Sequence, residues 1–348
     1  MISAIIRVRL GASMTIKLGI IGAGRIGRLH ANTLTTRVPG AQAIAIADIF
    51  EASAKSAAAD YSIPDYTSEP AEIINSGDID AVVICSSTDT HCRFITEAAG
   101  TGKQIFCEKP IAFDLAEIDA ALAAVADAGV QLQIGFNRRF DSNHARIKQA
   151  IDSGEIGEPH TLTIISRDPA PPPIDYIKVS GGLMMDMMIH DFDMCRFLLG
   201  EVEEIYAMAD VMVDPAIGEA GDIDTATVML RFENGAIGTI ENSRQAVYGY
   251  DQRVEVFGSR GAASSGNWHP NAVTISDASS VRRNLPLHFF IERYMDSYIA
   301  EMIAFVEALT KGGTVPVVGN DGRVPVLMAM GGMRSIAEKR PVRLDEIA

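Results

Sequence analysis

The sequence has 348 residues with 45 acidic and 30 basic side chains, which gives a formal net charge of -15. This much negative charge opposes binding to nucleic acid or to anionic membranes, and no cluster of lysine or arginine offsets it. A hydrophobic fraction of 47% and a charged fraction of 22% exclude a disordered or collagen-like chain. The length and composition fit a globular protein with two domains.

Residues 1–14 are apolar and weakly basic, but their apolar run is shorter than the core of a signal peptide. We expect them to be a disordered or mis-annotated extension. No later stretch is long enough to span a bilayer. The four cysteines lack the spacing of a metal site, so we expect reduced thiols, no bound metal and a cytoplasmic protein; they are Cys85, Cys92, Cys107 and Cys195.

Short apolar runs alternate with helical patterns from residue 16 to about residue 136. Such alternation predicts βαβ units and a parallel sheet covered on both faces. We therefore expect an α/β domain over residues 15–136.

After residue 137 the pattern changes to several strand-like runs with fewer helices. The predicted helices lie at about 144–153, 182–199 and 294–309, and the predicted strands cover 161–166, 203–213, 225–232, 235–247 and 252–259. Asn234-Gly235 stands between two of these strands and predicts a type I′ hairpin. These runs favour a second, α+β domain over residues 137–348 with a large, mainly antiparallel sheet.

A glycine motif, Gly22-Ala23-Gly24-Arg25-Ile26-Gly27, follows the first predicted strand and opens a helix. Gly22 permits a tight turn, Gly24 lets the backbone approach a pyrophosphate, and Gly27 lets helix and strand pack closely. Asp48 ends the next strand, where a carboxylate binds the adenine ribose and repels a 2′-phosphate. This context predicts a Rossmann domain that binds NAD rather than NADP. The alternative is a glycine turn without a ligand.

Asp186, His190 and Asp193 occur at positions i, i+4 and i+7 of the predicted helix 182–199, which places them on one face. Histidine is suited to accept a hydroxyl proton because its ordinary pKa is about 6.5. Asp186, one turn earlier, could orient the imidazole. The alternative is a histidine that simply bonds to an aspartate in a helix packing surface.

Lys109 stands in Cys107-Glu108-Lys109-Pro110 at the end of a predicted strand, where open α/β folds bind ligands. A lysine there can donate to a substrate hydroxyl and favour the developing alkoxide. The alternative is a surface lysine before a turn.

Ser87, Thr88 and His91 occur where the apolar run 81–87 passes into a helix, at the same edge of the sheet. They either cap that helix or contact the nicotinamide ribose, and the two roles are compatible. A zinc site built from His91, His190 and the nearby cysteines fits poorly, because no pair has the spacing of metal ligands.

Together these motifs resemble the Gfo/Idh/MocA family, which includes glucose-fructose oxidoreductase and inositol 2-dehydrogenase. The resemblance extends from about residue 16 to the end of the chain. It depends on the glycine motif, Glu108-Lys109-Pro110, the stretch GFNRRFD (135–141), and Gly181-Gly182 followed by Asp186 and His190. It implies a Rossmann domain joined to an α+β domain, with the substrate between them. It also implies a homotetramer, since the large open sheet commonly forms oligomer contacts in the family.

The resemblance assigns Lys109 to the reacting hydroxyl and makes Asp186 and His190 the acid/base pair. The expected NAD contacts are Gly22, Gly24, Arg25, Ile26, Gly27, Asp48, Ser87, Thr88, His91, Glu108 and Lys109. The expected polyol contacts are Lys109, Asn137, Arg138, Asp168, Asp186, His190, Asp193 and Tyr250.

The expected activity is oxidation of one secondary hydroxyl of a cyclic polyol, myo-inositol to its 2-keto product, with NAD as the hydride acceptor. Several donors and acceptors at a domain junction suit a neutral polyol. Two alternatives stay open: a dehydrogenase of another inositol isomer or a pyranose sugar, and a transcriptional sensor that binds the dinucleotide without turnover.

Overall fold

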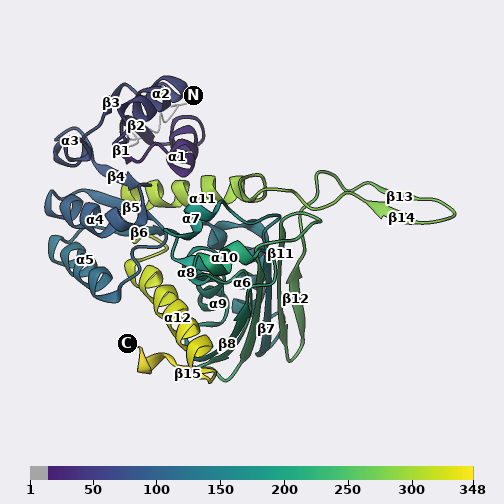
Figure 1. The fold of residues 1–348 in the computed structure, drawn as a ribbon. Helices are drawn as coiled ribbons and strands as arrows, with labels where there is room; N and C mark the ends of the chain where they lie inside the picture. Colours follow the sequence, from purple (N-terminus) through teal and green to yellow (C-terminus); the bar gives the residue numbers. More distant parts are fainter. Residues whose placement is uncertain (1–14, 348) are drawn as a thin grey trace, which may run out of the picture.

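The computed structural model describes residues 15–347, so the predicted extension 1–14 lies outside the described residues. Six parallel strands form the first sheet in the order β3-β2-β1-β4-β5-β6 (Figure 1). This order is that of a doubly wound dinucleotide-binding fold, in which ligands bind where the strand order reverses, between β1 and β4. The Rossmann prediction is confirmed.

The strands of this sheet are β1 (Ile16–Ile21), β2 (Ala41–Ala47), β3 (Asp65–Thr67), β4 (Ala81–Ile84), β5 (Gln104–Glu108) and β6 (Leu132–Gly135). The helices between them are α1 (Arg25–Thr36), α2 (Glu51–Tyr61), α3 (Pro70–Asn75), the 3-10 turn η1 (Thr88–Thr90), α4 (His91–Gly100) and α5 (Leu115–Ala128). Both faces of the sheet are apolar, as expected for parallel strands covered by helices.

The second sheet has seven strands in the order β12-β11-β7-β10-β9-β8-β15, and only β7 and β10 are parallel neighbours. Its strands are β7 (Pro159–Arg167), β8 (Val202–Asp210), β9 (Thr225–Phe232), β10 (Ile237–Ser243), β11 (Asp251–Gly258), β12 (Gly261–Ser265) and β15 (Val342–Arg343). Buried and exposed residues alternate along β9 and β11, so one face packs on the core and the other is open. A mainly antiparallel α+β domain is confirmed.

The remaining helices follow β6 in the chain. They are η2 (Asn137–Phe140), α6 (Ser142–Asp152), α7 (Ile174–Ile177), α8 (Gly182–Asp186), α9 (Ile189–Leu199), α10 (Pro215–Glu219), α11 (Phe290–Lys311), α12 (Gly319–Glu338) and η3 (Leu344–Glu346). Among residues 15–347, no helix is both long and apolar enough to cross a membrane.

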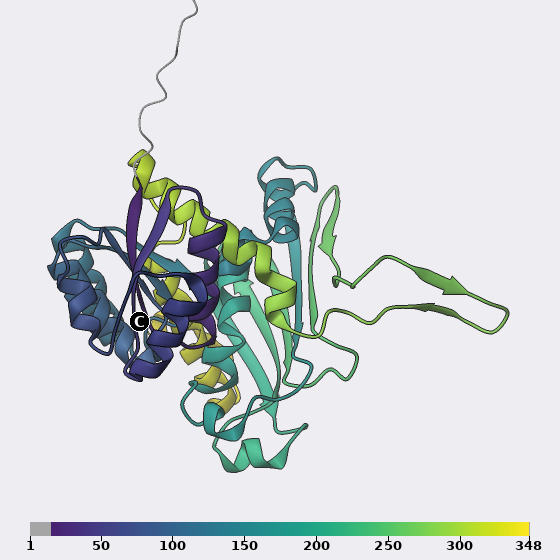
Figure 2. The same ribbon diagram turned by 90° about the horizontal axis from the view of Figure 1, so that it is seen from above.

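Helix α11 completes the core of the first sheet although it comes late in the chain (Figures 1 and 2). Its residues Met302, Phe305 and Val306 are buried in one cluster with Leu18 of β1 and Phe106 of β5. Val317, just after α11, accepts a hydrogen bond from Ile134 of β6 at 3.0 Å. In space, therefore, the carboxyl-terminal quarter of the chain belongs partly to the Rossmann domain.

The predicted single helix 182–199 is wrong, because the chain breaks at Met187 and Met188 between α8 and α9. The N–H of Met188 reaches back to the carbonyl of Leu183 at 2.9 Å, one residue further than in an α-helix. The N–H of His190 bonds to the carbonyl of Met187 at 3.3 Å. The carbonyl of Asp186, which His190 would use in a continuous helix, is left for another donor.

The type I′ hairpin at Asn234-Gly235 is also wrong. Gly235 has φ +88°, but Asn234 does not have the positive φ that a type I′ turn requires at both central positions. The N–H of Gly235 bonds to the carbonyl of Phe232 at 3.0 Å, and the N–H of Phe232 bonds to the carbonyl of Ala236 at 3.0 Å. This is a three-residue loop with glycine at the left-handed position, the next commonest hairpin connection.

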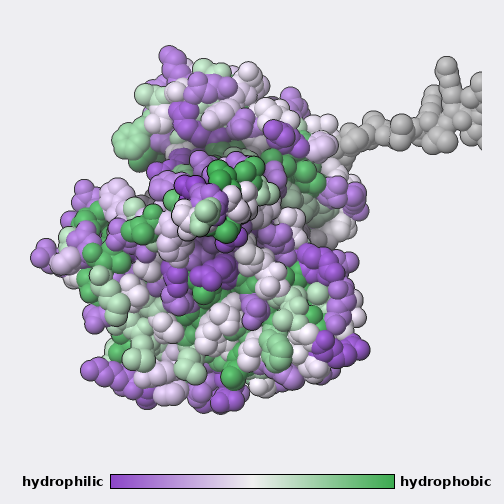
Figure 3. All heavy atoms as spheres, turned by 90° about the vertical axis from the view of Figure 1, so that its right-hand side faces the viewer, coloured by the Kyte–Doolittle hydropathy of each residue, from purple (hydrophilic) through white to green (hydrophobic). Residues whose placement is uncertain are grey.

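A long arm runs out from the body between β12 and α11 and carries β13 (Thr274–Ser276) and β14 (Val281–Arg283) (Figures 1 and 2). Four of its apolar side chains are 58% to 73% exposed; they are Val273, Ile275, Val281 and Leu285. Figure 3, which views the arm end-on, shows hydrophobic and hydrophilic side chains exposed together on this side of the molecule. The sequence analysis did not predict this arm.

Candidate active site

The glycine motif forms the turn between β1 and α1. Gly22 has φ +105°, and a Cβ at Gly27 would lie 1.9 Å from the carbonyl oxygen of Gly22. A Cβ at Gly24 would meet no atom within 4 Å, so the backbone is open to approach there. The first turn of α1 has neither a side-chain cap nor an acidic residue. Its unpaired N–H groups therefore suit a pyrophosphate.

The Asp48 carboxylate is fixed beside this turn by two backbone donors. Ala23 N–H donates to Oδ2 at 2.8 Å, and Phe50 N–H donates to Oδ1 at 2.9 Å. Arg25 is exposed at the same edge, with its guanidinium 5.5 Å from the centre of the Phe289 ring. The backbone therefore holds a carboxylate where the dinucleotide fold binds the adenine ribose, and these residues fit NAD.

We expect Gly27→Ala to raise the Kd for NAD by about tenfold, since the new Cβ collides with Gly22 and overpacking costs about 1–3 kcal/mol. Isothermal titration calorimetry with NAD measures the change. Gly100→Ala is the matched control, because a Cβ at this helical glycine meets no atom within 4 Å. An unchanged Kd in Gly27→Ala would contradict the close packing described for this turn.

The residues after β4 divide into two groups. Ser87 is exposed and Thr88 half-buried at the start of η1, so both keep access to the cofactor edge. His91 is 2% exposed, and its ring nitrogens face two carbonyl oxygens: Nδ1 lies 2.8 Å from that of Pro110 and Nε2 lies 3.1 Å from that of Ser86. Burial lowers the pKa of His91. We therefore infer that His91 stabilises the turn after Lys109, and we no longer propose that it contacts NAD.

Lys109 reaches across from the end of β5 to the break between α8 and α9. Its Nζ donates to the backbone carbonyl of Asp186 at 2.7 Å and lies 3.7 Å from the Asp186 carboxylate. This carbonyl is the one that the helix break leaves without its usual donor. The break therefore explains how a lysine of the Rossmann domain is fixed against the second domain, with 16% of its side chain still exposed.

The Asp186 carboxylate is surrounded by residues that the sequence analysis missed. Tyr176 Oη donates to Oδ1 at 2.9 Å, and Arg244 Nη1 lies 3.4 Å from Oδ2. Arg244 is buried and also contacts Asp222 at 3.5 Å. Tyr176 and Arg244 stand 10 and 58 residues from Asp186 in the chain and share no motif with it, so one sequence offered no signal for either.

His190 follows the helix break and lies edge-on to the ring of Phe136. Its Nδ1 is buried without a partner, and among residues 15–347 no hydrogen bond joins it to Asp186. The predicted aspartate-oriented imidazole is therefore not formed here; Asp186 fixes Lys109 instead. Burial and the positive charges of Lys109 and Arg138 hold the pKa of His190 well below its ordinary value. The imidazole is consequently neutral and able to accept a proton.

Arg138 and Tyr250 belong to a buried polar network beside His190. Arg138 donates to Asp191 at 2.7 Å, to Ser166 at 3.1 Å and to the Tyr250 hydroxyl at 3.3 Å. Tyr250 is 6% exposed. Both residues lie close to the candidate site, but their polar groups already have protein partners.

Two other predicted polyol contacts are placed elsewhere. Asp193 is completely buried and accepts bonds from Arg139 at 2.6 to 3.0 Å. Asn137 is 2% exposed and donates to Ser297 at 2.9 Å. Because both side chains are buried and bonded within the protein, we remove them from the proposed polyol contacts.

Asp168 lies among the charged groups of the candidate site. Burial raises its pKa to about 6, Arg244 lowers it, and the charge of Asp186 raises it further. The Asp168 carboxyl is half-buried and has no side-chain partner among residues 15–347, so it can bond to a hydroxyl of a ligand in either protonation state. The geometry therefore supports Asp168 as a polyol contact.

The structure combines a dinucleotide-binding turn with a lysine, an aspartate and a neutral histidine that lie together at the domain junction. This combination defines an NAD-dependent oxidoreductase. Residues 16–136 match the oxidoreductase family with an NAD-binding Rossmann fold, and residues 144–264 match the carboxyl-terminal domain of the same GFO/IDH/MocA family. The chain belongs to this family.

Three relatives show how far the similarity extends. The oxidoreductase YrbE of Bacillus subtilis is 50% identical over 94% of this chain and 96% of its own length. Myo-inositol 2-dehydrogenase of Thermotoga maritima is 46% identical over 95% of this chain and 99% of its own. The crystal structure of scyllo-inositol dehydrogenase from Lactobacillus casei with NAD(H) and scyllo-inositol has a TM-score of 0.89 at 28% identity, over 95% of this chain and 99% of that one.

Proposed function

We propose that this enzyme oxidises the 2-hydroxyl of myo-inositol to the 2-keto product with NAD. The observation that carries the proposal is the junction of Lys109, Asp186 and the neutral His190 at the end of β5. The inositol dehydrogenases among its relatives support the choice of a cyclic polyol.

The residues act on the proton of the reacting hydroxyl. One N–H of the Lys109 ammonium group donates to the Asp186 carbonyl, and the other N–H groups can donate to the substrate oxygen. The positive charge of Lys109 there favours the alkoxide. His190 accepts the hydroxyl proton because it is neutral. Asp168 and Asp186 offer acceptors to neighbouring hydroxyls. NAD, when bound, supplies the acceptor for the hydride that leaves the same carbon.

The test is NADH absorbance when purified enzyme and NAD are given myo-inositol, scyllo-inositol, chiro-inositol or glucose. We expect the fastest turnover with myo-inositol. Faster turnover of another compound would reassign the substrate, and no turnover despite NAD binding would favour the sensor alternative.

We expect Asp48→Ser to lower kcat/KM for NAD by about 10- to 100-fold and to raise the use of NADP. A hydrogen bond to a charged group contributes about 1.5–3 kcal/mol, and the carboxylate no longer repels a 2′-phosphate. Steady-state kinetics with both cofactors measures the switch. Asp65→Ser, an exposed aspartate on β3, is the control. If the ratio of kcat/KM for NAD to kcat/KM for NADP did not change in Asp48→Ser, Asp48 would not select the cofactor.

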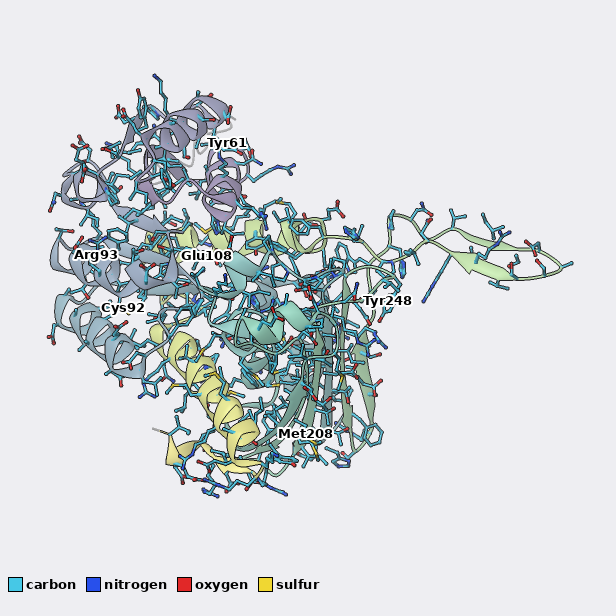
Figure 4. All side chains as sticks on the ribbon, viewed as in Figure 1. Tyr61, Cys92, Arg93, Glu108, Met208 and Tyr248 are labelled. Atoms are coloured by element: carbon cyan, nitrogen blue, oxygen red, sulfur yellow. The ribbon has the colours of Figure 1, made fainter. Side chains whose placement is uncertain are left out.

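We also propose a cytoplasmic homotetramer. The open face of the second sheet exposes Met208, Met229, Ile237 and Phe257 by 47% to 65%, and Figure 4 labels Met208 on β8. Adjacent apolar side chains on an open sheet face are typical of a protein interface. Sedimentation velocity tests the assembly; a monomer at micromolar concentration would contradict it.

A further inference from the structure

Three ionisable side chains from different elements meet in the interior beside Lys109. They are His30 of α1, Glu108 at the end of β5 and Glu301 of α11, and one nitrogen or oxygen of each lies within 4.8 Å of the others. His30 and Glu301 are completely buried, and Glu108 is 9% exposed. Figure 4 labels Glu108 where β5 approaches α11. The proton transfer described above uses none of the three.

The hydrogen bond between His30 and Glu108 defines where the proton and the charge lie. His30 Nε2 and Glu108 Oε1 are 2.6 Å apart, whereas His30 Nδ1 is buried and has no partner among the described residues 15–347. A neutral histidine has one N–H, and leaving a buried N–H unpaired is costly. The proton is therefore on Nε2, and the hydrogen bond that it makes to Glu108 favours the ionised form of this carboxyl. The same carboxylate packs on the backbone of β6, where a Cβ at Gly135 would be 3.0 Å away.

Glu301 completes the cluster as a neutral acid. Neither of its carboxyl oxygens has a partner within residues 15–347, and no lysine or arginine there pairs with Glu108 or Glu301. Two adjacent buried carboxylates without a cation are strongly unfavourable. Burial, and then the charge of Glu108, raises the pKa of Glu301 well above its ordinary value. The cluster therefore carries a single negative charge, on Glu108.

A bound metal ion would be another way to balance two carboxylates, but the contacts disfavour it. A histidine that ligates a metal normally donates its other ring N–H, and His30 Nδ1 has no acceptor. Two ligand atoms of tetrahedral zinc lie roughly 3.3 Å apart at bond lengths of about 2.0 Å. The 2.6 Å separation of His30 and Glu108 is that of a hydrogen bond.

The location of this charge points to a role in cofactor selection. Glu108 directly precedes Lys109, which holds the reacting hydroxyl in the proposed function, and the nicotinamide ring must reach the carbon that carries this hydroxyl. The ring is positively charged in NAD+ and neutral in NADH. We propose that the ionised Glu108 makes this enzyme bind NAD+ more tightly relative to NADH, and that His30 and Glu301 are positioning residues that keep one fixed charge there. This inference rests on the proposed function for the location of the ring.

The size of the effect follows from electrostatics. For an assumed separation of about 8 Å between a unit charge and the ring, at an effective dielectric constant of about 20, the binding constant changes by roughly thirtyfold. We therefore expect Glu108→Gln to raise the Kd for NAD+ by at least about tenfold and to change the Kd for NADH by less than about threefold.

The experiment measures both dissociation constants without any polyol, by calorimetry for NAD+ and by fluorescence for NADH, so it is independent of the substrate assignment. Glu301→Gln is the matched variant: it replaces a group that is already neutral, so the ratio of the two constants should change by less than about twofold. Glu97→Gln, an exposed glutamate on α4, controls for distant charge, and Glu108→Asp should retain the preference. Thermal unfolding verifies that each variant folds.

Three results would overturn the proposal. Equal weakening of both cofactors in Glu108→Gln would make Glu108 purely structural. A shift of the ratio in Glu301→Gln as large as that in Glu108→Gln would place the charge on Glu301. A ratio that changes when EDTA removes a metal found by elemental analysis would mean that the cluster holds a cation instead.

Discussion

Replacing His190 by alanine is expected to lower kcat for polyol oxidation by about 10²- to 10⁴-fold, the range for loss of a general base. His190 is the neutral imidazole at the domain junction and accepts the hydroxyl proton in the proposed function. The Kd for NAD should change little. His160→Ala, at an exposed histidine, is the matched control. A variant that keeps full kcat would remove His190 from the mechanism.

The pH dependence of the same reaction is a second readout of His190. Its pKa in the folded enzyme is well below the ordinary value of 6.5, because the site is buried and Lys109 and Arg138 are positively charged. The base form is therefore present at pH 6.5 and above, and is lost only when the pH falls through the lowered pKa. We expect kcat/KM for oxidation to stay level as the pH falls through 6.5. A decline centred near 6.5 would contradict the lowered pKa.

Lys109→Met should lower kcat by about 10²- to 10³-fold, comparable to loss of one donor that stabilises a developing oxyanion. Methionine keeps much of the length and apolar stem but can neither donate to the substrate oxygen nor bind the free carbonyl of Asp186. Stopped-flow measurement of NADH formation tests this step directly.

Lys178→Met is the matched control for Lys109→Met, because Lys178 is exposed and pairs with the exposed Asp175. The Kd for NADH, whose nicotinamide ring is neutral, should stay within about threefold of the native enzyme in Lys109→Met. If the loss appeared in NAD binding and not in kcat, Lys109 would serve the cofactor rather than the reacting hydroxyl.

The Rossmann half could be predicted because its signals are local. The glycines needed for the turn, the aspartate at the end of β2 and the alternation of strands and helices all occur within short windows. Helix α12 shows the opposite case. It contains Gly319, Gly322 and Pro325, which disfavour helix, yet a Cβ at Gly322 would lie 2.4 Å from Ile111. Tertiary packing determined this helix, and no local pattern reveals such contacts.

The candidate site could be predicted only in part, for a similar reason. Lys109, Asp186 and His190 were found from strand ends, spacing and family motifs. Helical spacing placed Asp186 against His190, but the break after α8 turns the Asp186 carbonyl toward Lys109. Arg244 approaches Asp186 from a distant part of the chain through the folded second domain. Partners of this kind depend on long-range contacts that a single sequence does not encode in any short motif.

The position of α11 has a consequence for folding during synthesis. When residues 15–136 leave the ribosome, the Rossmann core still lacks Met302, Phe305 and Val306, which lie more than 160 residues later. At roughly 5–20 residues per second, the partly covered sheet would wait on the order of 10–30 seconds for them. A nascent chain of this enzyme therefore presents apolar sheet surface during translation, which makes it a natural client for chaperones that act on the ribosome.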